Sequence, residues 1–284
     1  MYFSDNELDQ LIHDDVPFVD LTTHVLGIGA AQGVMRYSGR EPTLLCCTEE
    51  AVRILQKVGL QVDFSLSSGT YVEANTLILT AHGSAQAIHS GWRVALNLME
   101  HACGVATRTH ILVQRARAVN PHIVITATRK SLPWAKKMMV KAILTGGALP
   151  HRLGLSETFL LFDEHLRFMG GLDAALPQLR AIKTRLGEKM LVAEAHNAAD
   201  ALKLAQAGVD MVQLDKLSVD ATCQVNEQLK TAAPSVKVAI AGGINAENCA
   251  AYAATGVDML VTSALYFGKP ADIKADIQAS IPIC

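Results

Sequence analysis

The chain has 284 residues, of which 50% are hydrophobic and 18% are charged, and its formal net charge at pH 7 is −2. This length is sufficient for one large α/β barrel or for two domains, each with its own core. The near-neutral charge and the low aromatic content of 5% argue against a nucleic-acid-binding protein, because such proteins need a clustered basic surface.

The amino terminus and the cysteines predict a cytoplasmic protein without membrane insertion. The first seven residues lack a basic segment followed by an apolar core, and no apolar run reaches membrane-spanning length. Six cysteines occur without C-x-x-C spacing and without histidines placed for a zinc site, so we expect reduced, mostly buried thiols. Cys103 is a candidate nucleophile, but no neighbouring base supports that role.

The first hundred residues alternate irregularly between short helices and strands. After an acidic amphipathic start, the pattern predicts a helix over residues 48–58, with Glu49 and Glu50 favouring its amino end, and a strand over residues 76–80. Residues 84–120 predict two helices broken near Gly104, with Ser84 as the N-cap and Pro121 after the second helix. This mixture is typical of a small α+β domain.

A regular strand-helix period begins at residue 123 and predicts a parallel sheet. Repeated βα units with right-handed crossovers form open sheets or barrels, and six strands predict a barrel shorter than the usual eight. The expected strands cover residues 123–128, 158–162, 190–194, 210–214, 236–241 and 257–262, and the expected helices cover residues 134–145, 172–186, 198–206, 219–231 and 246–254.

Four basic or potentially basic residues flank the first of these βα units. Arg129 and Lys130 follow the strand, and His151 and Arg152 follow the helix that comes after it. The carboxyl ends of parallel strands face the ligand, and positive charge placed there is costly unless an anion compensates for it. The pattern favours a phosphate or carboxylate site; the alternative is that these are solvated loop cations paired with surface acids.

The later strand ends carry the remaining polar candidates. Glu194 and Asp215 end two strands, Gly242 and Gly243 follow a third, and Ser263 follows the last. The two glycines precede the predicted helix over residues 246–254, so their backbone amides could cradle a phosphate, although a Gly-Gly pair is also common in plain turns. The two acids could instead be caps or partners of the cations. Their position on one rim with the cations favours a common site.

In this order and spacing, the motifs resemble those of the quinolinate phosphoribosyltransferases, also called nicotinate-nucleotide pyrophosphorylases, over nearly the whole chain. The residues that carry the resemblance are Asp20-Leu21-Thr22-Thr23, Arg93 to Asn97, Cys103 to Thr109, Thr128-Arg129-Lys130, Gly146-Gly147, His151 to Leu155, Glu194, Asp215 and Gly242-Gly243-Ile244.

The resemblance implies an amino-terminal α/β sandwich (residues 1–107) and an open six- or seven-stranded parallel α/β barrel (residues 108–284), whose carboxyl-terminal tail is free to pack back on the sandwich. It also implies a homodimer with sites shared between subunits, so that Arg93 enters the partner's site. Phosphoribosyl pyrophosphate with Mg²⁺ would be the donor, and a small heteroaromatic compound the acceptor.

The same resemblance assigns roles to individual residues. Lys130, Glu194 and Asp215 would be catalytic, and Glu194 and Asp215 would meet Mg²⁺ through the substrate. The implied substrate-binding residues are Arg93, Arg129, Lys130, His151, Arg152, Glu194, Asp215, Gly242, Gly243 and Ser263.

The departures from the family pattern bear on the acceptor. Phe162 stands where the family has a substrate-contacting lysine, a loss on the order of 1.5–3 kcal/mol for a dicarboxylate. Further departures are Trp92, Pro133-Trp134, Lys216 and Ser263. Together they resemble the branch of the family that is encoded with molybdate-transport systems.

Three hypotheses remain open. The first is a magnesium-dependent phosphoribosyltransferase, or pyrophosphorylase, associated with molybdenum transport and acting on a heteroaromatic carboxylate-like acceptor other than quinolinate. The second is a decarboxylating quinolinate phosphoribosyltransferase that makes nicotinate mononucleotide for NAD synthesis. The third is a non-catalytic accessory protein that binds molybdate or another oxyanion, since arginine and lysine bind such anions as readily as phosphate.

Overall fold

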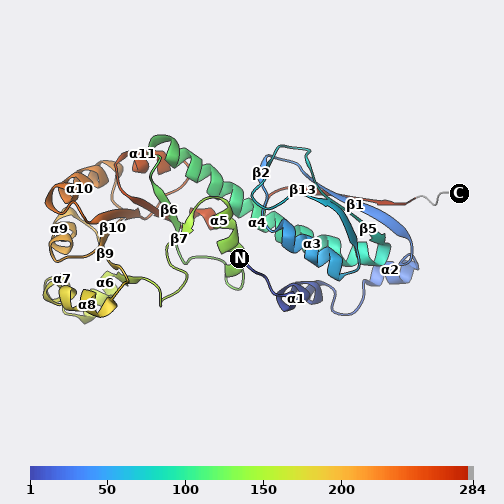
Figure 1. Ribbon diagram of the computed structural model, residues 1–284, viewed down its shortest axis with the longest axis horizontal. Coiled ribbons are helices and arrows are strands. Elements are labelled where there is room, and N and C mark those ends of the chain that lie inside the picture. Colours follow the sequence, from blue (N-terminus) through green and yellow to red (C-terminus); the bar gives the residue numbers. More distant parts are fainter. Residues whose placement is uncertain (281–284) are drawn as a thin grey trace. The chain divides into compact units, whose positions relative to one another are not determined.

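The computed structural model describes residues 1–280 and divides the chain into two compact units (Figure 1). The first unit comprises residues 1–110, 132–146 and those from 267 onward, and the second comprises residues 111–131 and 147–266. One unit carries an antiparallel sheet and the other a seven-stranded parallel sheet, which confirms the predicted α/β class.

The first unit is built on a four-stranded antiparallel sheet with the order β13-β1-β5-β3. Its strand β13 comes from the end of the chain and pairs with β1 from Gly33↔Ala279 to Gly39↔Ile273. The tail is therefore part of this sheet. The strands of the unit are β1 (Gln32–Gly39), β2 (Thr43–Leu44), β3 (Gln61–Ser65), β4 (Tyr71–Val72), β5 (Leu77–Ser84) and β13 (Ile273–Ala279).

One long helix, α4 (Ala85–Val119), replaces the two helices expected around Gly104. The expected break is wrong, because the glycine serves a close contact: a Cβ at Gly104 would lie 2.8 Å from the carbonyl oxygen of Lys269 and 3.0 Å from the nitrogen of Ala271. The predicted cap is confirmed, since the hydroxyl of Ser84 accepts a hydrogen bond from the Ala87 amide at 3.2 Å.

The remaining helices of the first unit are short. The helix predicted over residues 134–145 begins two residues late, because Trp134 has φ +67° and its side chain is fully exposed. These helices are α1 (Asp5–Asp15), α2 (Leu21–Leu26), α3 (Thr48–Lys57) and α5 (Lys136–Thr145). On α5, Lys141 makes ion pairs with Glu50 at 2.5 Å and with Glu49 at 3.1 Å, both on α3.

The second unit is a seven-stranded parallel sheet with the order β7-β6-β12-β11-β10-β9-β8. The six predicted strands are present, and β7 adds a seventh that is too short for a periodicity signal. The strands are β6 (Val124–Ala127), β7 (Leu149–Pro150), β8 (Phe159–Leu161), β9 (Leu191–Ala195), β10 (Met211–Asp215), β11 (Lys237–Ala241) and β12 (Met259–Thr262). Its core cluster is formed by Leu160, Val192, Met211, Ala239, Ala241 and Val261.

Helices follow most of these strands, with three differences from prediction. The short helix over Asp163–Phe168 was not expected. The helix expected over residues 172–186 is divided by a 3-10 turn that contains Pro177, and the last helix begins at Cys249 rather than residue 246. The helices are α6 (Asp163–Phe168), α7 (Leu172–Ala175), α8 (Leu179–Leu186), α9 (Ala198–Gln206), α10 (Val219–Ala232) and α11 (Cys249–Ala254), with 3-10 turns η1 (Leu176–Gln178) and η2 (Ala264–Tyr266). Among the described residues, no helix has the length and apolarity needed to cross a membrane.

Candidate active site

The basic residues predicted for the site leave two neighbouring strands at their carboxyl ends. Arg129 and Lys130 follow β6, and His151 and Arg152 follow β7. The two strands pair in parallel, and the His151 amide extends the ladder by donating to the carbonyl oxygen of Ala127 at 2.9 Å. The two basic pairs, remote in sequence, are thereby placed side by side.

Their electrostatics fit an anion site. Burial and the charge of Arg129 hold the pKa of Arg152 below its ordinary value, and burial and the charge of Arg152 lower the pKa of His151. Within residues 1–280, no carboxylate forms an ion pair with Arg129, Lys130 or Arg152. The alternative in which Arg129, Lys130 and Arg152 are paired with surface acids is therefore not found among the described residues.

Phe162 brings the two edges of the sheet together at the same end. It follows β8, the edge strand opposite β7, and the guanidinium carbon of Arg152 lies 5.6 Å from its ring centroid. The imidazole of His165 also stacks on the Phe162 ring, with 5.7 Å between the two ring centroids. An aromatic ring, at a position where the sequence resemblance predicts a lysine, thus contacts a predicted substrate-binding arginine.

The acidic side of the rim comes from β9 and β10. Glu194 and Gln213 are register partners, and the Gln213 amide nitrogen donates to Glu194 at 3.1 Å. Asp215 ends β10. Burial, followed by the nearby negative charge of Asp215, raises the pKa of Glu194 above its ordinary value. Two crowded, half-buried carboxylates are a suitable place for a divalent cation.

His196 joins these acids and was missed by the sequence analysis. Its Nε2 lies 3.2 Å from an Asp163 oxygen and 3.6 Å from a Glu194 oxygen, and its Nδ1 lies 3.8 Å from an Asp215 oxygen. The available signal was the spacing: residues two apart in an extended strand project from one face, so Glu194 predicts the direction of His196.

The glycine turn after β11 leaves the space that the Asp215 carboxylate and the Lys216 side chain occupy. Gly242 has φ +92°, and a Cβ there would lie 2.5 Å from the Cγ of Lys216 and 3.1 Å from an Asp215 oxygen. Gly243 has φ +75°, but nothing lies within 4 Å of its Cβ position. Of this pair, only Gly242 is required for the close approach to the Asp215 carboxylate.

The helix amino terminus expected after these glycines is not there. Between them and α11 lies a turn in which the Asn248 side chain accepts from the Asn245 amide at 2.8 Å, so this amide is already used. The helix start predicted at residue 246 is therefore wrong, and phosphate binding by the backbone amides of Gly242 and Gly243 stays a prediction. Ser263 is half-buried directly after β12, between the strands that carry the basic and the glycine loops.

Arg93 belongs to the first unit, whereas the other predicted site residues belong to the second. It is an exposed residue of α4, and its guanidinium carbon lies 4.1 Å from the ring centroid of Trp92. Its entry into a partner's site stays a prediction. Cys103 is fully buried, and burial raises the pKa of its thiol to about 12, which argues against a nucleophile.

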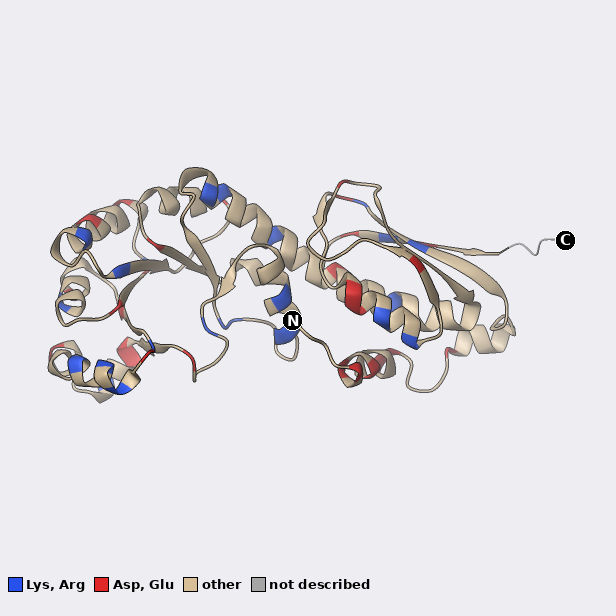
Figure 2. Ribbon diagram, viewed as in Figure 1, with Lys and Arg blue, Asp and Glu red and all other residues tan. Residues whose placement is uncertain are grey.

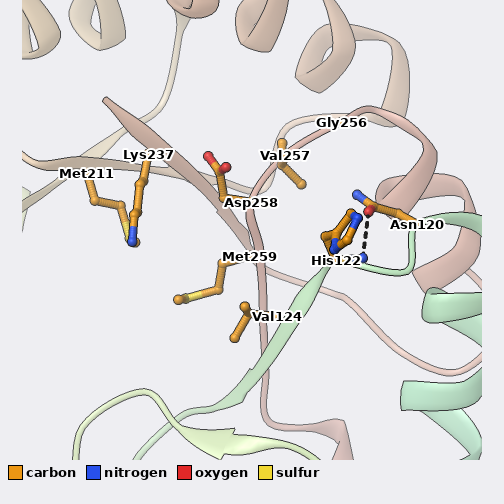
Figure 3. Close-up of a pocket in the computed structure, with 9 residues that line it drawn as sticks. All are labelled: Asn120, His122, Val124, Met211, Lys237, Gly256, Val257, Asp258 and Met259. Carbon is orange, nitrogen blue, oxygen red and sulfur yellow. Dashed lines mark hydrogen bonds between the residues drawn. The ribbon is translucent and has the colours of Figure 1, made fainter. Parts of the chain in front are cut away.

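A pocket at the opposite end of the parallel sheet contains none of the predicted residues (Figure 3). Its volume is about 360 Å³, and the strand residues in it are the first residues of β6, β10, β11 and β12. Across the helices of the second unit, basic and acidic residues are interspersed (Figure 2). The separation of basic from acidic residues at the carboxyl ends of the strands is therefore not a general feature of this unit. The pocket is lined by Asn120, His122, Val124, Met211, Lys237, Gly256, Val257, Asp258 and Met259.

Comparison with known families covers both parts of the sequence. Residues 20–103 match the model of the quinolinate phosphoribosyl transferase N-terminal domain, and residues 105–276 match that of the C-terminal domain. The chain is similar to the nicotinate-nucleotide pyrophosphorylase structure from Francisella tularensis, with a TM-score of 0.85, 24% identity, and 96% of this chain and 95% of that chain covered. The likeness to this solved structure concerns the fold alone.

Curated relatives are similar over most of the length. A protein from Rhodobacter capsulatus named "Putative pyrophosphorylase ModD" is 41% identical over 87% of this chain and 94% of its own length. A protein of the same name from Pasteurella multocida is 34% identical over 99% of this chain and 100% of its own length. A "Probable nicotinate-nucleotide pyrophosphorylase [carboxylating]" from Methanothermobacter thermautotrophicus is 30% identical over 95% of this chain and 97% of its own length. The chain belongs to the quinolinate phosphoribosyl transferase family and is an enzyme of the pentosyltransferase class.

Proposed function

We propose that the enzyme transfers the phosphoribosyl group of phosphoribosyl pyrophosphate to a heteroaromatic, carboxylate-like acceptor other than quinolinate, and that it serves molybdenum transport. The observation that carries the proposal is the pairing of two rims at one end of the parallel sheet. Cations that form no ion pair with a described carboxylate follow β6 and β7, and crowded carboxylates end β9 and β10.

These two rims meet the two electrostatic demands of the reaction. The bond between ribose C1′ and the pyrophosphate oxygen breaks, and its electron pair leaves with pyrophosphate. Arg129, Lys130 and Arg152 supply positive charge for this polyanion, and charge-assisted bonds from arginine are the stronger kind. Positive charge develops at C1′, and Glu194 and Asp215 place negative charge for it.

The new bond forms from the lone pair of a ring nitrogen of the acceptor to C1′, which leaves the ring nitrogen positively charged. If the acceptor has a carboxylate next to that nitrogen, its loss as CO₂ leaves an electron pair on the ring carbon, which then takes up a proton. Holding both reactants in line accounts for a large share of such catalysis, since it converts a bimolecular step into a unimolecular one.

Mg²⁺ fits the acidic rim by the chemistry of its donors. The ion prefers carboxylate oxygen and substrate phosphates, and Glu194 and Asp215 are carboxylates. Burial, followed by the negative charge of Asp215, raises the pKa of Glu194. When bound with the donor, Mg²⁺ would neutralise charge on the departing pyrophosphate. We therefore keep Glu194 and Asp215 as the residues that meet the ion through the substrate.

Phe162 supports an acceptor other than quinolinate, because it removes the cation that a second acceptor carboxylate would need. The competing candidate is decarboxylating synthesis of nicotinate mononucleotide, favoured by the 30% identical relative with a nicotinate-nucleotide pyrophosphorylase name. The link to molybdenum transport rests on the sequence resemblance to the branch of the family that is encoded with molybdate-transport systems. We also propose a homodimer in the cytoplasm in which Arg93 of one subunit completes the site of its partner.

Incubation with phosphoribosyl pyrophosphate, Mg²⁺ and a panel of pyridine and other heteroaromatic carboxylates tests the proposal. Pyrophosphate release is followed by enzyme-coupled assay and the ribosylated product by mass spectrometry. Release with a non-quinolinate acceptor supports the proposal, and release with quinolinate at least as fast supports the competing candidate. Tight molybdate binding without any transfer would support the non-catalytic oxyanion hypothesis.

A further inference from the structure

The acidic rim contains more metal-binding donors than a site that meets Mg²⁺ only through its substrate requires. One ligand atom each from Glu194, His196 and Asp215 lies within 4.8 Å of the others. An ion with bonds of about 2.1 Å in octahedral geometry holds its ligands about 3 Å apart when adjacent and about 4 Å apart when opposite. In the structure, Nε2 of His196 lies 3.6 Å from Glu194 and Nδ1 lies 3.8 Å from Asp215, so holding one ion between them requires the ring to turn one nitrogen toward both carboxylates.

Buried Gln213 gives a second, independent indication of a ligand. Its side chain is 4% exposed and donates to Glu194, while its Oε1 has no hydrogen-bond partner in the part of the chain that the structure describes. An orphaned buried acceptor costs about 1–3 kcal/mol. Because this oxygen belongs to the same amide that contacts Glu194, a water molecule bound to a metal ion at Glu194 is placed to donate to it.

The charge balance also favours a cation. Asp163, Glu194 and Asp215 surround a single imidazole, and the one lysine paired with this group in the described residues, Lys216, lies 3.6 Å from Asp215 with a side chain 80% exposed. The side chain of His196 is 42% exposed, so its ring is free to turn one nitrogen toward both carboxylates.

We propose that Glu194, His196 and Asp215 directly hold a divalent transition-metal ion of the Mn²⁺ or Co²⁺ kind, before any sugar pyrophosphate arrives. Carboxylates alone suit Mg²⁺ and Ca²⁺, whereas an imidazole beside them shifts the preference toward first-row transition metals. With Nδ1 of His196 as the metal ligand, Asp163, which lies 3.2 Å from Nε2, would accept a hydrogen bond from that nitrogen and orient the ring, as carboxylates do next to metal-bound histidines. The use of this ion in catalysis rests on the proposed function; its binding does not.

Metal titration of the enzyme without phosphoribosyl pyrophosphate tests the inference. Free Mn²⁺ is followed by electron paramagnetic resonance, and bound Co²⁺ by its visible absorption. We expect one ion per chain, with Co²⁺ and Mn²⁺ bound more tightly than Mg²⁺. His196→Asn should weaken Co²⁺ binding by at least about tenfold, a loss of at least about 1.4 kcal/mol. His196→Asp should keep Mg²⁺ binding and lose the nitrogen-dependent part of the Co²⁺ spectrum.

His122→Asn is the matched control, because His122 is an exposed histidine of the same unit at the other end of the sheet. It should bind Co²⁺ as the wild type does. Equal Co²⁺ affinity in His196→Asn and wild type, or no binding of Mn²⁺ at millimolar concentration, overturns the inference. Mg²⁺-dependent transfer without metal binding in the absence of donor would refute the metal site alone, whereas metal binding without any transfer would refute the proposed function alone.

Discussion

The guanidinium of Arg152 and the ring of Phe162 connect the two edge strands of the seven-stranded sheet, with 5.6 Å between the guanidinium carbon and the ring centroid. One residue is predicted to bind the donor, and the other stands where the sequence resemblance predicts a lysine. We therefore predict that acceptor choice and donor binding depend on residues in contact.

Phe162→Lys should therefore restore activity with quinolinate. A charged hydrogen bond of about 1.5–3 kcal/mol corresponds to a rise in kcat/KM of about 10- to 150-fold. Phe162→Leu, which removes the ring without adding charge, should give no such rise. Steady-state kinetics with quinolinate and saturating donor measure both variants. Equal rates in the two variants would show that the acceptor is selected by other residues.

The glycine pair after β11 offers a matched test of the Asp215 position. An L-residue in the left-handed region costs about 1–2 kcal/mol, so Gly242→Ala and Gly243→Ala should both lower Tm, and Gly242→Ala should lower it further because its Cβ also clashes with its neighbours. Only the Cβ at position 242 would meet Asp215 and Lys216. We expect transfer activity to fall strongly in Gly242→Ala and to stay near wild type in Gly243→Ala. The same activity in both variants would remove the role assigned to this close approach.

Glu194 gives a prediction of pH dependence. Burial and the charge of Asp215 raise its folded-state pKa above the ordinary 4.5, so ionisation of this carboxyl destabilises the folded protein. The penalty is absent well below pH 4.5 and fully present above the raised folded-state pKa. Glu194→Gln should therefore raise Tm at pH 7.5, leave it nearly unchanged at pH 4, and abolish transfer.

The Glu194→Gln comparison is made by thermal unfolding with a chelator present, because a bound cation would itself compensate the two carboxylates. Glu164→Gln, on the exposed side of α6, is the control and should leave Tm unchanged at both pH values. A Tm gain that is the same at pH 4 and pH 7.5 would contradict the electrostatic explanation.

Lys141 and Glu50 form a buried ion pair in the first unit, with side chains 14% and 5% exposed. Burial lowers the pKa of Lys141, but the hydrogen bonds to Glu50 and Glu49 and the nearby negative charge together outweigh this effect and leave the pKa raised. Lys141→Met would strand a buried carboxylate and should reduce the free energy of unfolding by about 3–5 kcal/mol. Denaturant unfolding measures this loss.

Two further variants complete the Lys141 test. Adding Glu50→Leu to Lys141→Met should recover most of the loss, because no charge is then left unpaired. Lys57→Met breaks an exposed pair with Asp9 and should cost no more than about 1 kcal/mol. A Lys141→Met loss as small as that of Lys57→Met would show that water reaches Glu50.

Local patterns predicted much of the second unit because each strand there is a short, buried, apolar segment. The helix over residues 198–206 has the bounds that were predicted, with Asn197 as its cap. Elements with little local signal were not predicted. Strand β7 has only two residues, and its pairing with β6 is a tertiary contact. Gly104 was misread because its requirement comes from a distant segment, residues 269–271, that packs on the helix.

In the candidate site, too, local patterns predicted some features, and others arise only from tertiary contacts. Strand ends predicted the residues of both rims, since the carboxyl ends of parallel strands share one edge. The sequence did not identify His196 or Asp163 as neighbours of Glu194, because they meet only when β8, β9 and β10 pair. It also placed the glycines before a helix that begins later, because the Asn245–Asn248 turn resembles a helix start in sequence.

Isothermal titration with phosphoribosyl pyrophosphate and Mg²⁺ tests the central claim most directly, namely that the residues after β6 and β7 bind the donor. We predict saturable binding by the wild type, a large loss of affinity in Arg152→Ala, and unchanged binding in the control Arg185→Ala, an exposed arginine of α8. No heat at millimolar donor, or equal affinity in Arg152→Ala and wild type, would contradict the account.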